Sequence, residues 1–530
     1  MIKGKKEVYR DRWRSLSEKD YVIDSDENSD YMYDIIARVI NEAGPRLPCS
    51  ENEKKAAELL SKELENYCDS VEIEKFMHYP ELGVSRWPPR CAIIVLISVA
   101  VFLLYPFLPI VFSALAAGIS LFGLLNIYFQ YLKAEEWSPK IYPYKPKESR
   151  NVVGVIKPSG EIKKRVVFSG HIDSAHRFNL MQYTHEGYIY FVIGGLICLF
   201  NFPILQIRQL VVILAGVNEA PLATIFNWLA ILIPICLGIG YIILDIISAK
   251  ILNETRREKI FWGAISSLTG KTVLLILGIV VYQILVSFSL FEYIMTNPSG
   301  FKTAILVLLN YLPFIIAFIL FISKEGVPGA LDNLSAVAIA MCVAKILKDW
   351  KTAYPNRFPK NTEVVIALFG SEESGCNGSK AFAKRHAAEY NQIDTTCVNM
   401  DTIADPEIIW IFKRESSVRI DFDPETVKLL AESAEELNLN YKVGNQPWVS
   451  GGSDASGLTK YGLRAASLIG LKFAHYLYYY HTDRDDISII NKERRPCTDY
   501  GTEWYNRNMR CAFENALKIC LKYLEKKDKE

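Results

Sequence analysis

The stretch EVVIALFGSEESGCNGSKAF, residues 363–382, decides the fold, because it joins a strand to a helix through a polar turn. Residues 363–370 are mostly apolar and β-branched, which predicts a buried strand, and residues 379–390 predict the helix that follows. The same alternation recurs along the chain, with strands predicted at 71–76, 151–156, 165–170, 397–400 and 465–470 and helices at 335–347 and 424–437. This order predicts an α/β fold with a mostly parallel sheet flanked by helices.

The N-terminal part of the chain adds two predicted helices. They lie within residues 30–66 and are separated by GPRLPCS, residues 44–50. Ser50 and Glu53 form an S-x-x-E pattern, so we expect Ser50 to cap the second helix.

The composition indicates a chain with both a soluble and a membrane part. Charged residues make up 22% of it, near a soluble average, yet 50% is apolar. With 60 Lys and Arg against 59 Asp and Glu, the net charge of +1 argues against a nucleic-acid partner. The 11 cysteines are scattered and form no C-x-x-C pair, which favours a reducing compartment over a disulfide framework.

Long apolar runs predict an α-helical transmembrane bundle of about six helices. Residues 91–132 contain no charged side chain, and one helix of that length would reach roughly 60 Å, twice the hydrocarbon thickness of about 30 Å. Because Pro106 and Pro109 lie near its middle, we predict a hairpin of two helices. Four more runs are each long enough to cross alone: 187–207, 222–244, 272–291 and 303–323.

Basic residues predict the orientation of this bundle. Lys250, Arg256, Arg257 and Lys259 lie in the loop 248–270, and Lys324 and the lysines of 133–147 lie on the same side. Since short cytoplasmic loops are enriched in Lys and Arg, we expect a multi-pass protein with both termini and the soluble domain in the cytoplasm.

Residues able to bind a metal follow the predicted strands. His171 follows 165–170, Glu372 and Glu373 follow 363–370, and Asp401 follows 397–400, with Asp332 and His481 farther along the chain. Imidazole and carboxylate ligands without thiolate suit zinc. One ion takes three or four protein ligands, so this set predicts two ions that share a carboxylate. Glu372 and Glu373 reach the metals together only if the chain turns after Gly370, because neighbours on a strand point to opposite faces.

The sequence resembles the M28 metallopeptidase family of zinc-dependent aminopeptidases and carboxypeptidases. The resemblance covers about residues 30–525, and six stretches carry it in the family's order: FSGHIDS (168–174), PGALDNLSAVA (328–338), LFGSEESGCNGSKAF (368–382), NMDTIA (399–404), GGSDASG (451–457) and YHTDRDD (480–486). The clear departure is the interval between His171 and Asp332, which is a short loop in soluble relatives.

The resemblance implies a role for each of these residues. Asp332 would bridge two zinc ions, and the other ligands would be His171, Glu373, Asp401 and His481. Glu372 would be the general base, and Asp173 would support His171 as an outer partner. Tyr480 would donate to the oxyanion of the tetrahedral intermediate.

The resemblance and the apolar runs together predict a domain order. Peptidase segments 1–90, 133–186 and 324–530 are interrupted by a transmembrane hairpin at 91–132 and a four-helix insertion at 187–323. His171 and Asp332 must reach the same ion, so an even number of crossings has to separate them, and four are predicted.

The function expected from these features is hydrolysis of the peptide bond next to a free N-terminus, on hydrophobic or membrane-associated peptides at a lipid bilayer. Three alternatives stay open: an inactive receptor or scaffold with the peptidase fold, a transporter with a regulatory domain, and a single-zinc enzyme of the glutaminyl cyclase kind. The sequence indicates neither the oligomeric state nor the side-chain specificity.

Overall fold

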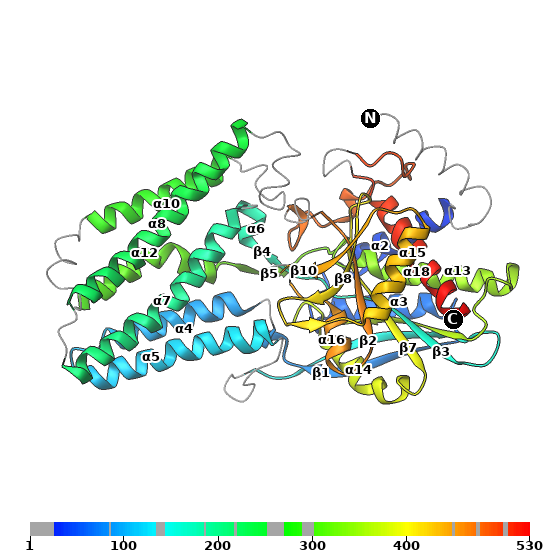
Figure 1. Ribbon diagram of the computed structural model, residues 1–530, viewed down its shortest axis with the longest axis horizontal. Coiled ribbons are helices and arrows are strands. Elements are labelled where there is room, and N and C mark those ends of the chain that lie inside the picture. The colour runs from blue at the N-terminus through cyan, green and yellow to red at the C-terminus, as the bar shows by residue number, and fades with distance from the viewer. Residues whose placement is uncertain are drawn as a thin grey trace.

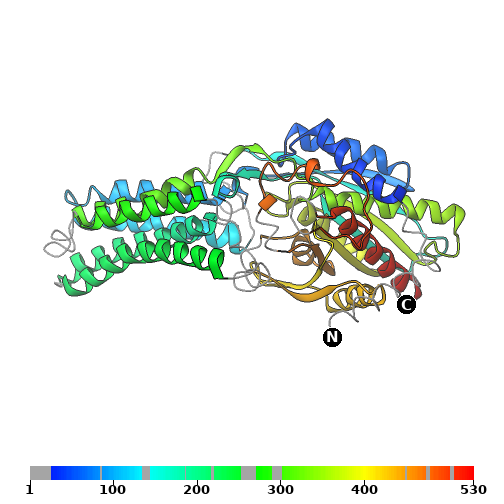
Figure 2. The same cartoon turned by 90° about the horizontal axis from the view of Figure 1, so that it is seen from above.

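The computed structural model describes residues 26–83, 86–133, 144–184, 187–216, 220–251, 270–288, 301–447, 451–472, 478–501 and 507–530. A bundle of long helices lies at one end of the molecule, and a sheet with its covering helices lies at the other (Figure 1). The view from above shows the same end-to-end arrangement (Figure 2). We call these parts the helical bundle and the α/β domain.

The sheet of the α/β domain is mixed. Its strands run in the order β1-β2-β6-β3-β7-β11-β8-β10, with β9 paired to β8. The bounds are β1 Ser70–His78, β2 Lys147–Ile156, β3 Lys164–His171, β6 Thr362–Phe369, β7 Asp394–Ile403, β8 Ile409–Glu415, β9 Ile420–Asp421, β10 Tyr441–Gln446 and β11 Ala465–Gly470.

The expectation of a mostly parallel sheet is correct for the centre and for the outer pair β8–β10, whereas antiparallel pairs occur on both sides of the centre. Strand β3 is parallel to both β6 and β7, and β7 is parallel to β11. The pairs β1–β2, β2–β6 and β11–β8 are antiparallel. Because the central strands are parallel, their carboxyl ends lie at one edge, and His171 at the end of β3 pairs with Phe369 at the end of β6.

Seven helices among the described residues cover this sheet. They are α2 Asp26–Ala43, α3 Glu51–Leu64, α13 Leu334–Ala353, α14 Asn377–Tyr390, α15 Pro424–Glu436, α16 Asp454–Lys460 and α18 Met509–Lys529. The predicted cap is confirmed, since the Ser50 side chain accepts a hydrogen bond from the backbone of Glu53 at 3.1 Å.

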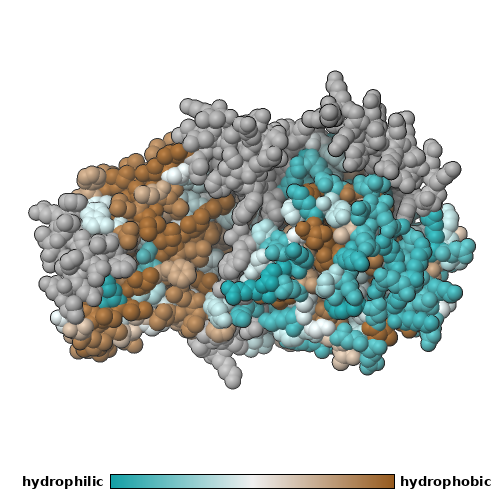
Figure 3. Space-filling view, viewed as in Figure 1, coloured by the Kyte–Doolittle hydropathy of each residue, from teal (hydrophilic) through white to brown (hydrophobic). Residues whose placement is uncertain are grey.

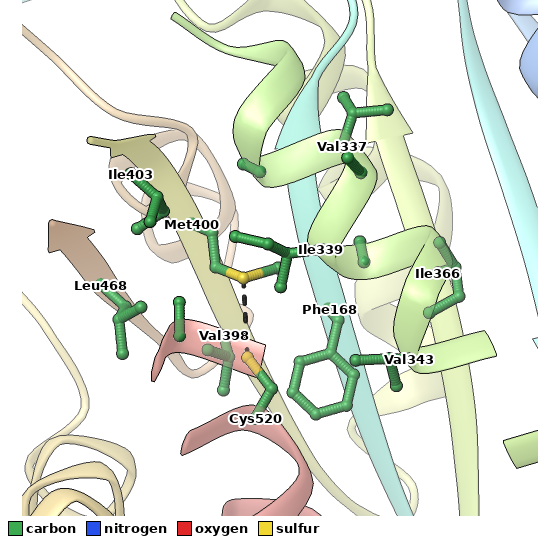
Figure 4. Packing of buried hydrophobic residues seen from close by; sticks show 14 of the residues in the cluster. Phe168, Val337, Ile339, Val343, Ile366, Val398, Met400, Ile403, Leu468 and Cys520 are labelled. Carbon is green, nitrogen blue, oxygen red and sulfur yellow. Dashed lines mark hydrogen bonds between the residues drawn. The ribbon is translucent and has the colours of Figure 1, made fainter. Parts of the chain in front are cut away.

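Helix α13 forms the centre of the hydrophobic core. Nearly every side chain in its first four turns is buried. It packs on β3 and β7 and against α18, and Figure 4 shows how Ile339 and Val343 lie close to Phe168 of β3. Each such side chain contributes about 1.5–3 kcal/mol on burial, so this core fixes the strands that carry the site.

The helical bundle consists of apolar helices that expose apolar side chains. Its members are α4 Trp87–Phe102, α5 Pro109–Asn126, α7 Tyr188–Ala215, α8 Ala220–Ile251, α10 Gly270–Phe288 and α12 Phe301–Ile319. The predicted hairpin is present, because the chain breaks between α4 and α5 and Pro109 begins the second helix. Figure 3 shows an apolar surface over this part and a polar one over the α/β domain.

Two helices in the described part of the chain, Pro109–Phe129 and Tyr188–Ala215, are long and apolar enough to cross a membrane. Four shorter apolar helices accompany them: Trp87–Phe102, Trp228–Ile243, Leu274–Phe288 and Val307–Ile319. The structure therefore supports two spans by length and composition, and the topology of about six spans stays a prediction. Most of the basic loop 248–270 lies outside the described residues.

The end of the last apolar run differs from the prediction. Helix α12 ends at Ile319, and residues Ile322–Gly326 form strand β5, which pairs antiparallel with β4, His176–Phe178. This strand could not be predicted from the apolar composition of 303–323, because a short apolar run can be either the end of a helix or a strand. The β4–β5 pair holds the start and the end of the four-helix insertion side by side.

Close packing of α7 against α12 provides a test of the bundle. A Cβ atom on Gly195 would lie 2.1 Å from the Phe318 ring, whereas one on Gly118 would meet nothing within 4 Å. We expect Gly195→Ala to lower the stability of the bundle by roughly 1–3 kcal/mol through overpacking. Gly118→Ala is the matched control and should be neutral or stabilising, since alanine favours helix. Thermal unfolding in detergent measures both, and equal melting temperatures would contradict this packing.

One disulfide departs from the expectation drawn from the cysteines. Cys497 and Cys511 are bonded, with Cα atoms 5.3 Å apart, and the other nine cysteines are free. Their spacing in the sequence carries no recognisable motif, so only the fold reveals that the start of α18 meets the preceding loop. A single bonded pair among 11 cysteines is not a disulfide framework, so the preference for a reducing compartment stays a prediction.

Candidate metal centre

Five side chains predicted as ligands come together at the carboxyl edge of the central strands. His171 Nε2 lies 3.2 Å from Asp332 Oδ1, although the four-helix insertion separates the two residues in sequence. His481 Nε2 lies 3.5 Å from Asp332 Oδ2 and 3.2 Å from Glu373 Oε1. The two oxygens of Asp332 thus face different histidines.

The ligand atoms form two groups that share one carboxylate. One group is His171, Asp332 and Asp401, and the other is Asp332, Glu373 and His481, with the ligand atoms of each group within 4.8 Å of one another. A third combination joins His171 to Glu372 and Glu373. The shared Asp332 is what a pair of neighbouring cations requires of a bridging ligand.

A turn after β6 places the two adjacent glutamates. Ser371 has a φ of 54°, a left-handed conformation that ends the strand. As a result, the Glu372 and Glu373 side chains both point into the cluster. This is the arrangement expected if Glu372 is the general base and Glu373 a ligand. The side chain of Glu372 is 11% exposed and that of Glu373 is 7% exposed, so Glu372 is the more accessible of the two.

Asp173 does more than support His171. The ring of His171 is held chiefly by the backbone of this residue, with Nδ1 3.0 Å from the Asp173 carbonyl oxygen and 3.5 Å from its carboxylate. The carboxylate accepts the backbone N–H groups of Glu372 at 2.9 Å and Glu373 at 3.0 Å. Asp173 therefore positions the glutamate pair as well as the histidine.

Tyr480 lies beside the cluster. Its ring stacks on that of His481 with centroids 3.7 Å apart, and its hydroxyl is 3.3 Å from where a Cβ on Gly451 would lie. The hydroxyl thus reaches the loop that begins GGSDASG, and its predicted role toward an oxyanion stays a prediction.

Burial and mutual repulsion shape the electrostatics of the cluster. Burial is the main cause that raises the pKa of Glu372, Glu373 and Asp401. Burial alone would raise the pKa of Asp332 too, but hydrogen bonds from His171 and His481 outweigh it and lower that pKa. Carboxylates crowded in this way need positive charge between them.

The donor set fits zinc. Imidazole nitrogen and carboxylate oxygen are zinc ligands, and Oε1 of Glu373 is buried without a hydrogen-bond partner among the described residues. Cys376 lies close by, with Sγ 3.3 Å from Glu372 Oε1, but it belongs to none of the three ligand groups among the described residues. A divalent cation would satisfy the unpartnered oxygen and relieve the repulsion.

The remaining histidines of the described chain have other partners. His78 contacts the Cys49 thiol at 2.9 Å, His176 contacts the Arg86 guanidinium at 2.9 Å, and His386 contacts Glu74. The other two histidines, His185 and His475, lie outside the described residues.

The sequence between the end of the helical bundle and α18 identifies the family to which this part is similar. Residues 321–495 match the model of Peptidase family M28. This M28 segment contains Asp332, Glu372, Glu373, Asp401 and His481, and the structure adds His171 from the other side of the insertion. No curated protein matches the chain.

Several solved structures are similar in outline. The zinc aminopeptidase BSAP from Bacillus subtilis is 10% identical, with 93% of this chain and 94% of that chain covered and a TM-score of 0.42. An aminopeptidase from Aneurinibacillus sp. strain AM-1 is 11% identical, with 93% and 92% covered and a TM-score of 0.41. A glutaminyl cyclase from Porphyromonas gingivalis is 10% identical, with 94% and 98% covered and a TM-score of 0.41. These low scores say nothing about the chemistry of this chain.

Sequence reasoning missed the groups that hold the ligand loops. Asp485 accepts the backbone N–H groups of Leu331 at 2.7 Å and Asp332 at 3.0 Å, so it positions the carboxylate that the two ligand groups share. Glu53 accepts hydrogen bonds from the backbone and side chain of Ser371 at 2.8 and 3.0 Å. Asp485 lies in YHTDRDD and Glu53 in the capping pattern, so a signal existed for both, but it did not reveal their contacts.

Arg46 is a third group that holds the ligand loops. Its side chain is fully buried and donates to the carbonyl oxygens of Ile172 at 2.7 Å, Pro328 at 2.7 Å and Gly329 at 3.1 Å. It thereby joins the segment after His171 to the segment before Asp332. Burial lowers the pKa of Arg46 to about 10, and the charge of Asp173 opposes the shift.

We expect Arg46→Met to destabilise the α/β domain by roughly 3–5 kcal/mol, because it leaves buried carbonyls and carboxylates without their cation. Thermal unfolding of the detergent-solubilised protein measures the effect. Arg38→Met is the matched control, since Arg38 is 41% exposed and pairs with Glu63 at the surface, a contact worth about 1 kcal/mol or less. Equal losses in the two variants would contradict the role of Arg46.

Proposed function

We propose that this chain is a membrane-integrated zinc metallopeptidase, an aminopeptidase that holds two zinc ions. The observation that carries the proposal is the pair of ligand groups that share Asp332. The match of residues 321–495 to Peptidase family M28 supports peptide hydrolysis as the reaction. His171, Asp332 and Asp401 would hold one ion, and Asp332, Glu373 and His481 the other.

Different residues of the chain have different roles in hydrolysis. When bound, the ions would lower the pKa of water and polarise the scissile carbonyl. Glu372 accepts the proton of the attacking water and returns it to the leaving amine. Cys376 donates its thiol hydrogen to Oε1 of Glu372 at 3.3 Å, which leaves Oε2 directed toward His171 at 3.8 Å. Asp173 holds the backbone of the glutamate pair, and Tyr480 stabilises the oxyanion.

Metal counting and a peptide series test this function together. We expect two zinc ions per chain by elemental analysis, and cleavage of peptides with a free N-terminus but not of the same peptides after N-acetylation. One ion per chain, with cyclisation of N-terminal glutamine, would instead identify a glutaminyl cyclase-like enzyme. A folded protein without zinc would identify an inactive receptor or scaffold.

We also propose that the chain crosses the bilayer about six times and acts on hydrophobic or membrane-associated peptides. The described helices of the insertions 91–132 and 187–323 form one apolar bundle next to the domain that carries the site. The basic residues of the loops support a cytoplasmic location for that domain. The bilayer would then keep the metal centre close to substrates that end at the membrane surface.

A pair of substrates tests the membrane part of the proposal. The same N-terminal sequence is presented once as a soluble peptide and once fused to a transmembrane helix in the same nanodisc as the enzyme. We expect kcat/KM to be higher for the anchored peptide by about 10²–10⁴-fold, the gain that a raised effective concentration allows. Equal kcat/KM values for the two substrates would contradict the membrane-associated substrate but not the proposed peptidase activity.

A further inference from the structure

The two histidines of the metal centre are oriented in different ways. Nδ1 of His171 contacts the Asp173 carbonyl at 3.0 Å. Nδ1 of His481 is buried and has no hydrogen-bond partner among the described residues, while its Nε2 faces Glu373 and Asp332. A metal-binding histidine usually donates its second N–H to an acceptor that fixes the ring. Something else must therefore hold the ring of His481.

Two aromatic rings pack against the imidazole of His481. Tyr480 stacks on one face with centroids 3.7 Å apart and planes 24° apart. Phe178 meets the imidazole at a steep angle, with centroids 4.3 Å apart and planes 79° apart. The backbone N–H of Phe178 also donates to the His481 carbonyl oxygen at 2.8 Å. The centroids of Tyr480 and Phe178 are 6.2 Å apart, so one ring covers a face of the imidazole and the other packs at its edge. The two contacts together restrict the rotation that a hydrogen bond would otherwise restrict.

Phe178 is itself attached to the helical bundle. Its ring lies 4.9 Å from that of Phe321, and the next residue, Asn179, donates its backbone N–H to the Phe321 carbonyl at 2.9 Å. Phe321 follows α12 and contacts Phe318 at 6.3 Å, which contacts Trp87 of α4 at 5.5 Å. A continuous row of aromatic rings therefore joins the bundle to a ligand of the metal centre.

We propose that Phe178 is a positioning residue for His481 and that, through Phe178, the packing of the helical bundle sets the zinc affinity of the site. The inference rests on the proposed zinc site and adds a property that hydrolysis does not require. The bundle is then more than an anchor, because a change at the contact of Gly195 with Phe318 reaches the metal without touching any ligand.

Zinc affinity, measured by competition with a chromophoric chelator, tests the role of Phe178. We expect Phe178→Leu to weaken binding of zinc by about 10–100-fold, the cost typical of losing a group that orients a ligand. Phe178→Tyr keeps the ring and should bind as the wild type does. Phe202→Leu is the matched control, because Phe202 is buried in α7 and contacts Tyr311 instead of the aromatic row.

Loading with Co²⁺ separates ring orientation from general instability. Reorientation of the His481 ring should change the visible absorption of the Co²⁺-loaded Phe178→Leu protein, and Phe202→Leu should leave the spectrum unchanged even if its melting temperature falls. A wild-type spectrum in Phe178→Leu would overturn the inference.

A double-mutant cycle tests the link to the bundle. Gly195→Ala would press on Phe318 and should lower zinc affinity by about 2- to 30-fold, the range of coupling between distant sites. In the Phe178→Leu background the same change should have little further effect, because the row is already interrupted. Additive losses would overturn the proposed route.

These measurements distinguish failure of the inference from failure of the proposed function. If the wild-type protein binds no zinc, both the inference and the proposed function are overturned. If it binds zinc and Phe178→Leu binds it equally well, only the inference is overturned.

Discussion

Replacing Glu372 by glutamine should lower kcat by about a thousandfold and leave the zinc content unchanged. A positioned general base contributes roughly 10²–10⁴-fold, and glutamine keeps the shape of the side chain but cannot accept the proton. Glu372 belongs to neither of the two ligand groups that share Asp332, so both ions should stay in place. Steady-state kinetics on a peptide with a free N-terminus, together with elemental analysis, measures the two quantities.

The control for this substitution is Glu74→Gln. Glu74 is also buried, at 3% exposure, but it pairs with Arg385 and His386 far from the cluster. We expect kcat to stay near the wild-type value in this variant. If Glu372→Gln were as active as Glu74→Gln, Glu372 would not be the base.

Asp332→Asn should remove both ions. Its two oxygens face His171 and His481 separately, and a carboxamide offers only one oxygen. Because residues that merely orient a ligand are worth about 10–100-fold in affinity, we expect a loss greater than a hundredfold for the shared ligand. Chelator competition measures the affinity, and activity should fall with it.

Asp405→Asn serves as the control for Asp332→Asn. Asp405 is likewise buried and lies 3.1 Å from Arg507, outside the ligand groups. This variant should lose stability and keep its zinc. Retention of one ion by Asp332→Asn would show that the two ions do not share this residue.

The sequence predicts the centre of the sheet and the ligand set because both depend on local signals. A buried strand that runs into a charged residue is readable for His171, for Glu372 and Glu373, and for Asp401. The requirement for a turn after Gly370 follows from strand geometry, and the structure supplies it in the left-handed Ser371.

What could not be predicted depends on contacts between distant segments. Arg46 acts through carbonyl groups of two other segments, and no pattern around it indicates them. The antiparallel sides of the sheet, the Cys497–Cys511 bond and strand β5 are likewise products of pairing, since each element has an unremarkable sequence by itself.

The pairing of β4 with β5 limits how a chain of this kind can change. In a bilayer, helices can be gained or lost between these strands only two at a time, since an odd number would leave β5 on the far side, away from its partner. A homologue with two or six helices at this point could keep the equivalents of His171 and Asp332 together. A homologue with three would have these two residues on opposite sides of the membrane. In a bilayer, the β4–β5 pair would thus require an even number of crossing helices between its two strands.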